Sequence, residues 1–167
     1  MADLNERLKV VSGGQTGVDR AALDAAYVAG LSIGGWCPSG RLAEDGTIAS
    51  DYPLTETPTA ESGQRTQWNV RDADATLIIS RQSDLYGGTL LTASTARRLS
   101  RPFVVADPED TSATASVLGW LQLLDVETLN VAGPRESEDP GIYRCAHSWL
   151  RQLFAGFPLD WLRAKSG

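Results

Sequence analysis

Three glycine-containing turns carry the residues whose types and spacing could bind a ligand. The first spans residues 13–20, reads GGQTGVDR, and connects a short apolar run to a helix-like segment. Glycine lets main-chain N–H groups approach a ligand without an intervening Cβ, and a helix N-terminus adds unpaired donors and a partial positive charge. This turn therefore favours an anion such as phosphate. It matches neither G-x-G-x-x-G nor G-x-x-x-x-G-K-[ST], so the dinucleotide fingerprint and the Walker loop are excluded.

The other two turns follow later apolar runs. Gly87 and Gly88 precede a helix-like segment, and the third turn contains Arg135, which could clamp a phosphate or carboxylate through two hydrogen bonds. Glu136 could orient that arginine or contact a sugar hydroxyl. The predicted ligand-binding residues are Gly13, Gly14, Gln15, Thr16, Gly17, Asp19, Arg20, Gly87, Gly88, Thr89, Gly133, Arg135, Glu136 and Ser137.

Each turn also has a purely structural interpretation. The first could be a strand-to-helix turn in which Thr16 caps the helix and Asp19 completes a carboxylate capping box. The second could be an ordinary capped loop, and the third a solvated loop with a local ion pair. Arg65 and Asn69 lie one helical turn apart, and the plain interpretation of both is hydrogen bonding between helix and loop, with a site-lining role as the alternative.

Cysteine and histidine offer little chemistry in this chain. Cys37 and Cys145 are the only cysteines and His147 is the only histidine, so we expect no disulfide framework and no zinc site. Cys37 could be a soft ligand or a reactive thiol, but a lone cysteine at a strand end is more often packed in the core. No metal site and no catalytic residue is predicted.

The elements that position these turns alternate along the chain. Apolar runs at residues 8–12, 31–36, 75–80, 102–106 and 129–132 have the length of strands and the nearly continuous hydrophobicity of a parallel sheet buried on both faces. Helical spacing is found at 18–29, 61–71, 89–99, 112–124 and 141–154, the last with Asp139 expected as its N-cap and Pro140 at its first position. This alternation predicts a three-layer α/β fold with a mainly parallel sheet. The three turns would then meet at the carboxyl edge, where such sheets bind ligands.

Composition limits the classes of function. The 167 residues carry 15 basic and 21 acidic side chains, a net charge of −6, which argues against a nucleic-acid-binding protein. No stretch approaches a membrane span, and the first residues do not form a signal peptide, so we expect a cytoplasmic protein. The length predicts a single domain over 1–167, with a core at about 9–154 and a tail at 155–167. Residues 37–59 form the longest stretch predicted to be irregular, a length typical of functional loops.

Apolar residues of the tail suggest a further interaction. Trp161, Leu159 and Leu162 need apolar cover, which either a homo-oligomer or packing onto the same subunit would provide.

Several motifs in the same order resemble one family. They are the segments at residues 12–21, 35–38, 40–41 with 43–46, 65–66 with 69–70, and 130–137. Together they resemble the molybdenum-carrier family, the circularly permuted YpsA-type branch of the SLOG superfamily, over about residues 9–154. The resemblance implies a Rossmann-like sandwich and an anionic ligand that is nucleotide-like or pterin-like, with a nucleotide or the molybdenum cofactor as the candidate cofactor.

The second turn departs from a pattern found in that superfamily. Residues 86–89 resemble the PGGxGT loop of the lysine-decarboxylase-like phosphoribohydrolases, but Tyr86 replaces the proline and residues 90–94 lack the acidic residue that follows the loop there. A carboxylate is the natural group to activate a glycosidic bond. A binding or carrier protein is therefore the leading hypothesis. The alternatives are a phosphoribohydrolase-like enzyme using Glu44, Asp45 or Glu136, and an interaction module whose turns bind nothing.

Overall fold

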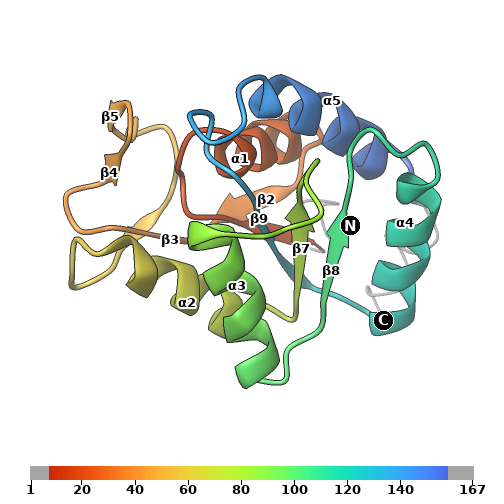
Figure 1. Cartoon of the computed structure of the whole chain (residues 1–167), viewed down its shortest axis with the longest axis horizontal. Coiled ribbons are helices and arrows are strands. Elements are labelled where there is room, and N and C mark those ends of the chain that lie inside the picture. The colour runs from red at the N-terminus through yellow and green to blue at the C-terminus, as the bar shows by residue number, and fades with distance from the viewer. Residues whose placement is uncertain (1–7, 158–167) are drawn as a thin grey trace, which may run out of the picture.

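A five-stranded parallel sheet forms the centre of the computed structural model, which describes residues 8–157 (Figure 1). Its strands are β1 (Lys9–Val11), β2 (Ser32–Gly34), β7 (Ala75–Ile79), β8 (Phe103–Ala106) and β9 (Thr128–Ala132), in the order β2-β1-β9-β7-β8. Every pairing in this sheet is parallel, and the register aligns Val11 with Asn130 and Ile78 with Ala132. The predicted parallel sheet is confirmed, and the turns after β1, β7 and β9 lie at its carboxyl edge.

Helices cover both faces of the sheet. On one face α1 (Val18–Val28) packs against α5 (Ile142–Ala155), and α4 (Ala113–Leu124) packs beside α5 (Figure 1). The small side chains Ala21, Ala22 and Ala25 of α1 are fully buried there, which allows the helix to approach the sheet closely. On the other face α2 (Ser62–Asp72) packs against α3 (Gly87–Arg98). This arrangement is the predicted three-layer α/β sandwich.

The segment between β2 and α2 is more ordered than expected. β3 (Trp36–Cys37) pairs with β6 (Thr55–Glu56), and β4 (Leu42–Ala43) forms a hairpin with β5 (Gly46–Thr47). Residues 37–59 are otherwise irregular, as predicted, and only these two-residue strands interrupt the stretch. The guanidinium of Arg41 organises the segment by donating hydrogen bonds to four carbonyl groups, those of Ile48, Ala49, Tyr52 and Leu54. Cys37 is fully buried beneath this segment, as expected for a packed cysteine.

Two helices begin differently from the sequence prediction. The N-cap of α1 is Gly17, without a side-chain hydrogen bond, because the Thr16 hydroxyl donates to Glu44 and accepts from the N–H of Glu136. The N-cap of α5 is Gly141, and Asp139 pairs instead with Arg81 at 2.6 Å. Both predicted caps are wrong, since these side chains find partners distant in sequence.

None of the described helices is long and apolar enough to span a membrane. The tail residues Leu159, Trp161 and Leu162 lie outside the described part of the chain.

Candidate ligand-binding site

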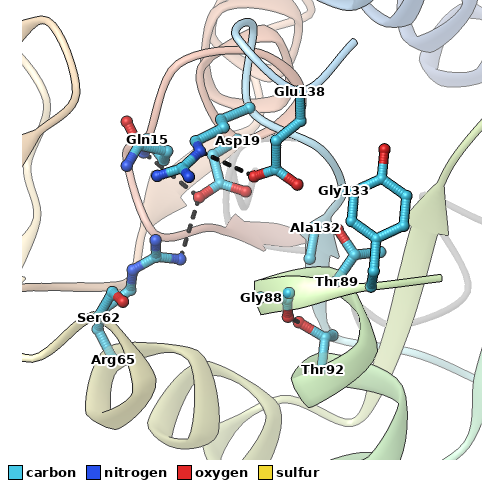
Figure 2. A pocket seen from close by; sticks show the side chains of 13 residues that line it. Gln15, Asp19, Ser62, Arg65, Gly88, Thr89, Thr92, Ala132, Gly133 and Glu138 are labelled. Carbon is cyan, nitrogen blue, oxygen red and sulfur yellow. Dashed lines mark hydrogen bonds and ion pairs between the residues drawn. The ribbon is translucent and has the colours of Figure 1, made fainter.

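A pocket of about 470 Å³ opens at the carboxyl edge of the sheet, where the three glycine turns converge (Figure 2). We call it the Gly87 pocket. Its walls come from the first turn, α2, the start of α3 and the segment after β9. The lining residues are Gln15, Asp19, Ser62, Arg65, Tyr86, Gly87, Gly88, Thr89, Thr92, Ala132, Gly133, Arg135 and Glu138.

The start of α3 presents main-chain donors to this pocket. No side chain caps the helix, and the N–H of Leu90 makes a helical bond back to Tyr86 at 3.2 Å. Gly87 has a φ of 58°, a left-handed conformation that favours glycine, and a Cβ on Gly88 would meet no atom within 4 Å. The N–H groups at this end can therefore be approached closely by an anion.

A buried ion pair forms the opposite wall. Asp19 is only 3% exposed, and its Oδ2 lies 3.4 Å from Nη1 of Arg65, which reaches across from α2 (Figure 2). The arginine lies directly over Gly13, where a Cβ would come within 2.4 Å of Nη1. Within the described chain, the buried Nε of Arg65 has no hydrogen-bond partner. Burial raises the pKa of Asp19, and Arg65 only partly opposes this effect.

The first glycine turn uses its own main-chain donors within the protein. The N–H of Gln15 donates to Asp19 at 3.3 Å, that of Thr16 to the Gln15 side chain at 3.0 Å, and that of Val18 to the carbonyl of Pro134 at 3.1 Å. The turn thus surrounds a carboxylate of its own helix. It contributes the side chains of Gln15 and Asp19 to the pocket, while these three amides are engaged elsewhere.

The remaining glycines of the first and third turns are needed for close packing. Gly14 faces Ile48 and Leu54, and a Cβ on Gly17 would approach the carbonyl oxygen of Pro134 to 2.4 Å. Gly133 lines the pocket and lies against the backbone of Ile79.

Arg135 and Glu138 form a second ion pair at the pocket. Nε of Arg135 lies 2.8 Å from Oε1 of Glu138 and 3.6 Å from Oε2 of Glu44. Figure 2 shows Glu138 directed into the pocket on the same side as Asp19. The other carboxylate oxygen of Glu138 lies 3.7 Å from the position that a Cβ of residue 87 would occupy. Glu138 therefore stands close to the start of α3.

Glu44 fastens the β4-β5 hairpin to the edge of this site. Its carboxylate accepts hydrogen bonds from the Thr16 hydroxyl, from the Ser137 N–H at 3.1 Å and from the Ser137 hydroxyl at 2.5 Å. These bonds hold the pKa of Glu44 below its usual value. Next to it, Asp45 pairs with Arg20 through two contacts of 2.5 and 2.9 Å. Neither acid lines the Gly87 pocket.

Four predicted residues lie on the far side of the first turn. A second pocket of about 570 Å³ contains Thr16, Gly17, Arg20 and Glu136. The carboxylate of Glu136 accepts hydrogen bonds from the N–H groups of Gly141 and Tyr143, at 2.5 and 3.0 Å, and so stabilises the start of α5. The structure thus divides most of the predicted residues between two pockets, and Gly13, Gly14 and Ser137 line neither of them.

Sequence reasoning missed several residues of the Gly87 pocket. Ser62, Tyr86, Thr92, Ala132 and Glu138 were not predicted, and Arg65 was given only a possible lining role. The spacing of three between Arg135 and Glu138 could have suggested their ion pair, but no local signal places Glu138 beside α3. The Asn69 side chain accepts a hydrogen bond from the N–H of Trp36 at 2.8 Å and donates one to its carbonyl group at 3.0 Å, so its role is structural, although its partner lies in β3 and not in a loop.

Among residues 8–157, no group of three or more His, Cys, Asp or Glu side chains could hold a metal ion. The donors at the Gly87 pocket are instead N–H groups and guanidinium groups, which suit an anion.

Comparisons with known proteins show the family and the fold of this chain. Residues 10–154 match the model of the circularly permutated YpsA SLOG family. A crystal structure from Syntrophus aciditrophicus SB, described as "Putative molybdenum carrier protein", is 40% identical in sequence and superposes with a TM-score of 0.84. The alignment covers 90% of this chain and 96% of that one. A comparison with curated proteins gives no match.

Proposed function

The chain belongs to the circularly permuted YpsA SLOG family, and from this premise we propose that it binds a nucleotide-like or pterin-like anion in the Gly87 pocket. A general carrier or binding role agrees with the family and with the description of the structural neighbour. The pocket volume of about 470 Å³ falls within the range of small-molecule sites.

The observation that carries this proposal is the convergence of Arg65 with the uncapped start of α3. The Arg65 side chain lines the pocket and is 14% exposed, so its guanidinium group is a donor for which a ligand oxygen is a suitable acceptor. The N-terminus of α3 adds main-chain donors and a favourable dipole across the same pocket.

The neighbour's description suggests molybdenum as a cargo. Molybdate is a tetrahedral oxyanion, and the molybdenum cofactor carries a phosphate on its pterin. Either would be held through its oxygen atoms by N–H and guanidinium donors, without direct ligation of the metal by this chain. Molybdate is therefore a useful probe beside a nucleotide.

The carboxylates suggested for the hydrolase alternative have structural partners. Glu44 is bonded to Thr16 and Ser137, Asp45 to Arg20, and Glu136 to the start of α5. This supports binding over hydrolysis as the leading function. The only acidic side chains among the residues that line the Gly87 pocket are Asp19 and Glu138, so a hydrolase would have to use one of these.

The test is calorimetric titration with AMP, molybdate and a reduced pterin, using two variants of Gly88. Gly88→Asp places a negative charge in the first turn of α3, where it should stabilise the helix but repel an anion. Gly88→Ala improves helix propensity without adding charge. We expect Gly88→Asp to abolish binding while raising or preserving the melting temperature, and Gly88→Ala to retain binding.

Gly119→Asp serves as a matched control, because Gly119 also lies in a helix with open space around it. It should not affect affinity. Failure of all three probes to bind the wild-type protein, or unchanged binding by Gly88→Asp, would contradict the proposal. A homo-oligomer is a separate proposal, which light scattering at micromolar concentration would decide.

A further inference from the structure

Glu138 brings a carboxylate to the place where the ligand anion of the proposed function would bind. One oxygen lies 2.8 Å from Nε of Arg135, and the other lies 3.7 Å from the Cβ position of residue 87 at the start of α3. Arginine and a helix N-terminus are the two features of a protein that most favour an anion. The chain therefore supplies an anion of its own to this part of the pocket.

Local structure holds Glu138 in this position. The N–H of Glu138 donates to the carbonyl of Arg135 at 3.0 Å, which closes a turn after β9 and places both side chains on the pocket side. Only 22% of the Glu138 side chain is exposed. The carboxylate is thus tethered within a few ångströms of Arg135 in the folded protein.

The ion pair between Arg135 and Glu138 is nevertheless weak enough for a ligand anion to replace Glu138. The Arg135 side chain is 48% exposed, and ion pairs at such sites add little to stability because solvent screens them. A ligand can displace Glu138 without breaking a strongly buried contact. The outgoing carboxylate can turn toward solvent, so displacement need not leave a buried unpaired charge.

We infer that Glu138 sets the affinity threshold of the pocket: its carboxylate is an internal competitor that lowers the affinity of every anionic ligand there, so that a dianionic tetrahedral group still binds whereas a carboxylate ligand binds only weakly. This inference rests on the proposed function. A ligand carboxylate would make the same interactions as the Glu138 carboxylate, which has a high effective concentration because it belongs to the same chain. Such a ligand would therefore gain little by replacing it. A phosphate dianion brings greater charge and more acceptor oxygens to Arg135 and α3, and so can displace Glu138.

The test compares AMP with adenosine 5′-carboxylate, which share a nucleoside and differ in the anion. Wild-type protein should bind AMP and bind the carboxylate analogue at least tenfold more weakly. In Glu138→Gln the side chain keeps its shape but no longer competes as an anion. If the native pair is formed about nine-tenths of the time, affinity for AMP should rise about tenfold, and affinity for the carboxylate analogue should rise by about the same factor, because the same competitor is removed for both ligands.

Asp51→Asn is the matched control, because Asp51 is exposed and its substitution removes the same unit of negative charge outside the pocket. It should change neither affinity by more than about twofold, because a distant exposed charge is screened by salt. Glu138→Ala should shift both affinities in the same direction as Glu138→Gln.

The remaining outcomes are distinguishable. If wild type binds AMP and Glu138→Gln binds it no more tightly, the inference about Glu138 is wrong and the proposed function stands. If Glu138→Gln binds AMP more weakly, Glu138 accepts a hydrogen bond from the ligand, and the inference is again overturned. If neither protein binds AMP, molybdate or a reduced pterin, both the inference and the proposed function fall.

Discussion

Asp19 and Arg65, 46 positions apart in the sequence, meet through a 3.4 Å contact between Oδ2 and Nη1 beside Gly13. The pair joins the start of α1 to α2 and closes one wall of the Gly87 pocket. Because the N–H of Gln15 donates to the same carboxylate, the pair also fixes the shape of the first glycine turn. An aspartate within that turn thus has a structural role as well as a place in the pocket.

Substitution of Gly13 and of Gly17 should lower the free energy of unfolding by different amounts. Gly13→Ala would place a Cβ 2.4 Å from Nη1 of Arg65, a flexible side-chain end that can move, so we expect a loss of about 1 kcal/mol and weakened anion binding. Gly17→Ala would meet the backbone of Pro134 from a φ of 77°, so we expect a loss of about 3 kcal/mol. Urea denaturation measures both, and an equal effect at the two positions would contradict this explanation.

Asp19 should reveal its burial in the pH dependence of stability. Its pKa is raised above the unfolded value near 3.8, so the folded protein holds this proton more tightly than the unfolded chain. The free energy of unfolding should therefore fall as the pH rises from 3.8 through the folded pKa. The difference between wild type and Asp19→Asn, measured by urea denaturation, should decrease across that window and be constant above it.

Asp45→Asn serves as the comparison, because its effect on the free energy of unfolding should change with pH in the opposite direction to that of Asp19→Asn. The Arg20 guanidinium holds the pKa of Asp45 below 3.8, so its stabilisation is present above that pH and lost as the pH falls through the folded pKa. The difference between wild type and Asp45→Asn should increase with pH. If the stability differences for the two variants changed with pH in the same direction, burial would not be the dominant influence on the pKa of Asp19.

Glu44 should control the order of the loop after β9. In Glu44→Gln, the Ser137 N–H loses its charged acceptor, so we expect faster amide hydrogen exchange at Ser137 by NMR. Because the pKa of Glu44 is lowered from 4.5, protection of this amide in wild type should persist above that pH and decline as the pH falls below it. Glu56→Gln is the control, since it removes the charge from the acceptor of the Gly40 N–H and should affect that amide alone.

Glu136 should contribute to stability without contributing to ligand binding. Glu136→Ala removes both acceptors at the start of α5, and loss of a helix cap typically costs about 1 kcal/mol. Thermal melting should show this loss, while titration with an anion that binds wild type should give an unchanged affinity. A large loss of affinity at unchanged stability would instead place Glu136 in the ligand site.

The order of elements could be predicted from the sequence because it depends on local patterns. Continuous apolar runs indicate strands buried on both faces, and the runs at 75–80 and 129–132 correspond to β7 and β9. Glycines following such runs predicted where strands turn into helices. Thr16 and Asp139 were wrongly predicted as helix caps, since both side chains bond instead to residues far along the chain, Glu44 and Arg81.

The sequence by itself determined the parallel α/β architecture and the convergence of three glycine turns at one edge of the sheet. Tertiary structure decided which turn presents free donors: Asp19 and Pro134 engage the amides of the first, whereas the start of α3 has no side-chain cap. It also brought Arg65 and Glu138 into the pocket. The physical reason is that periodicity records which face of an element is buried, while the partner of a polar group depends on residues that only folding brings together.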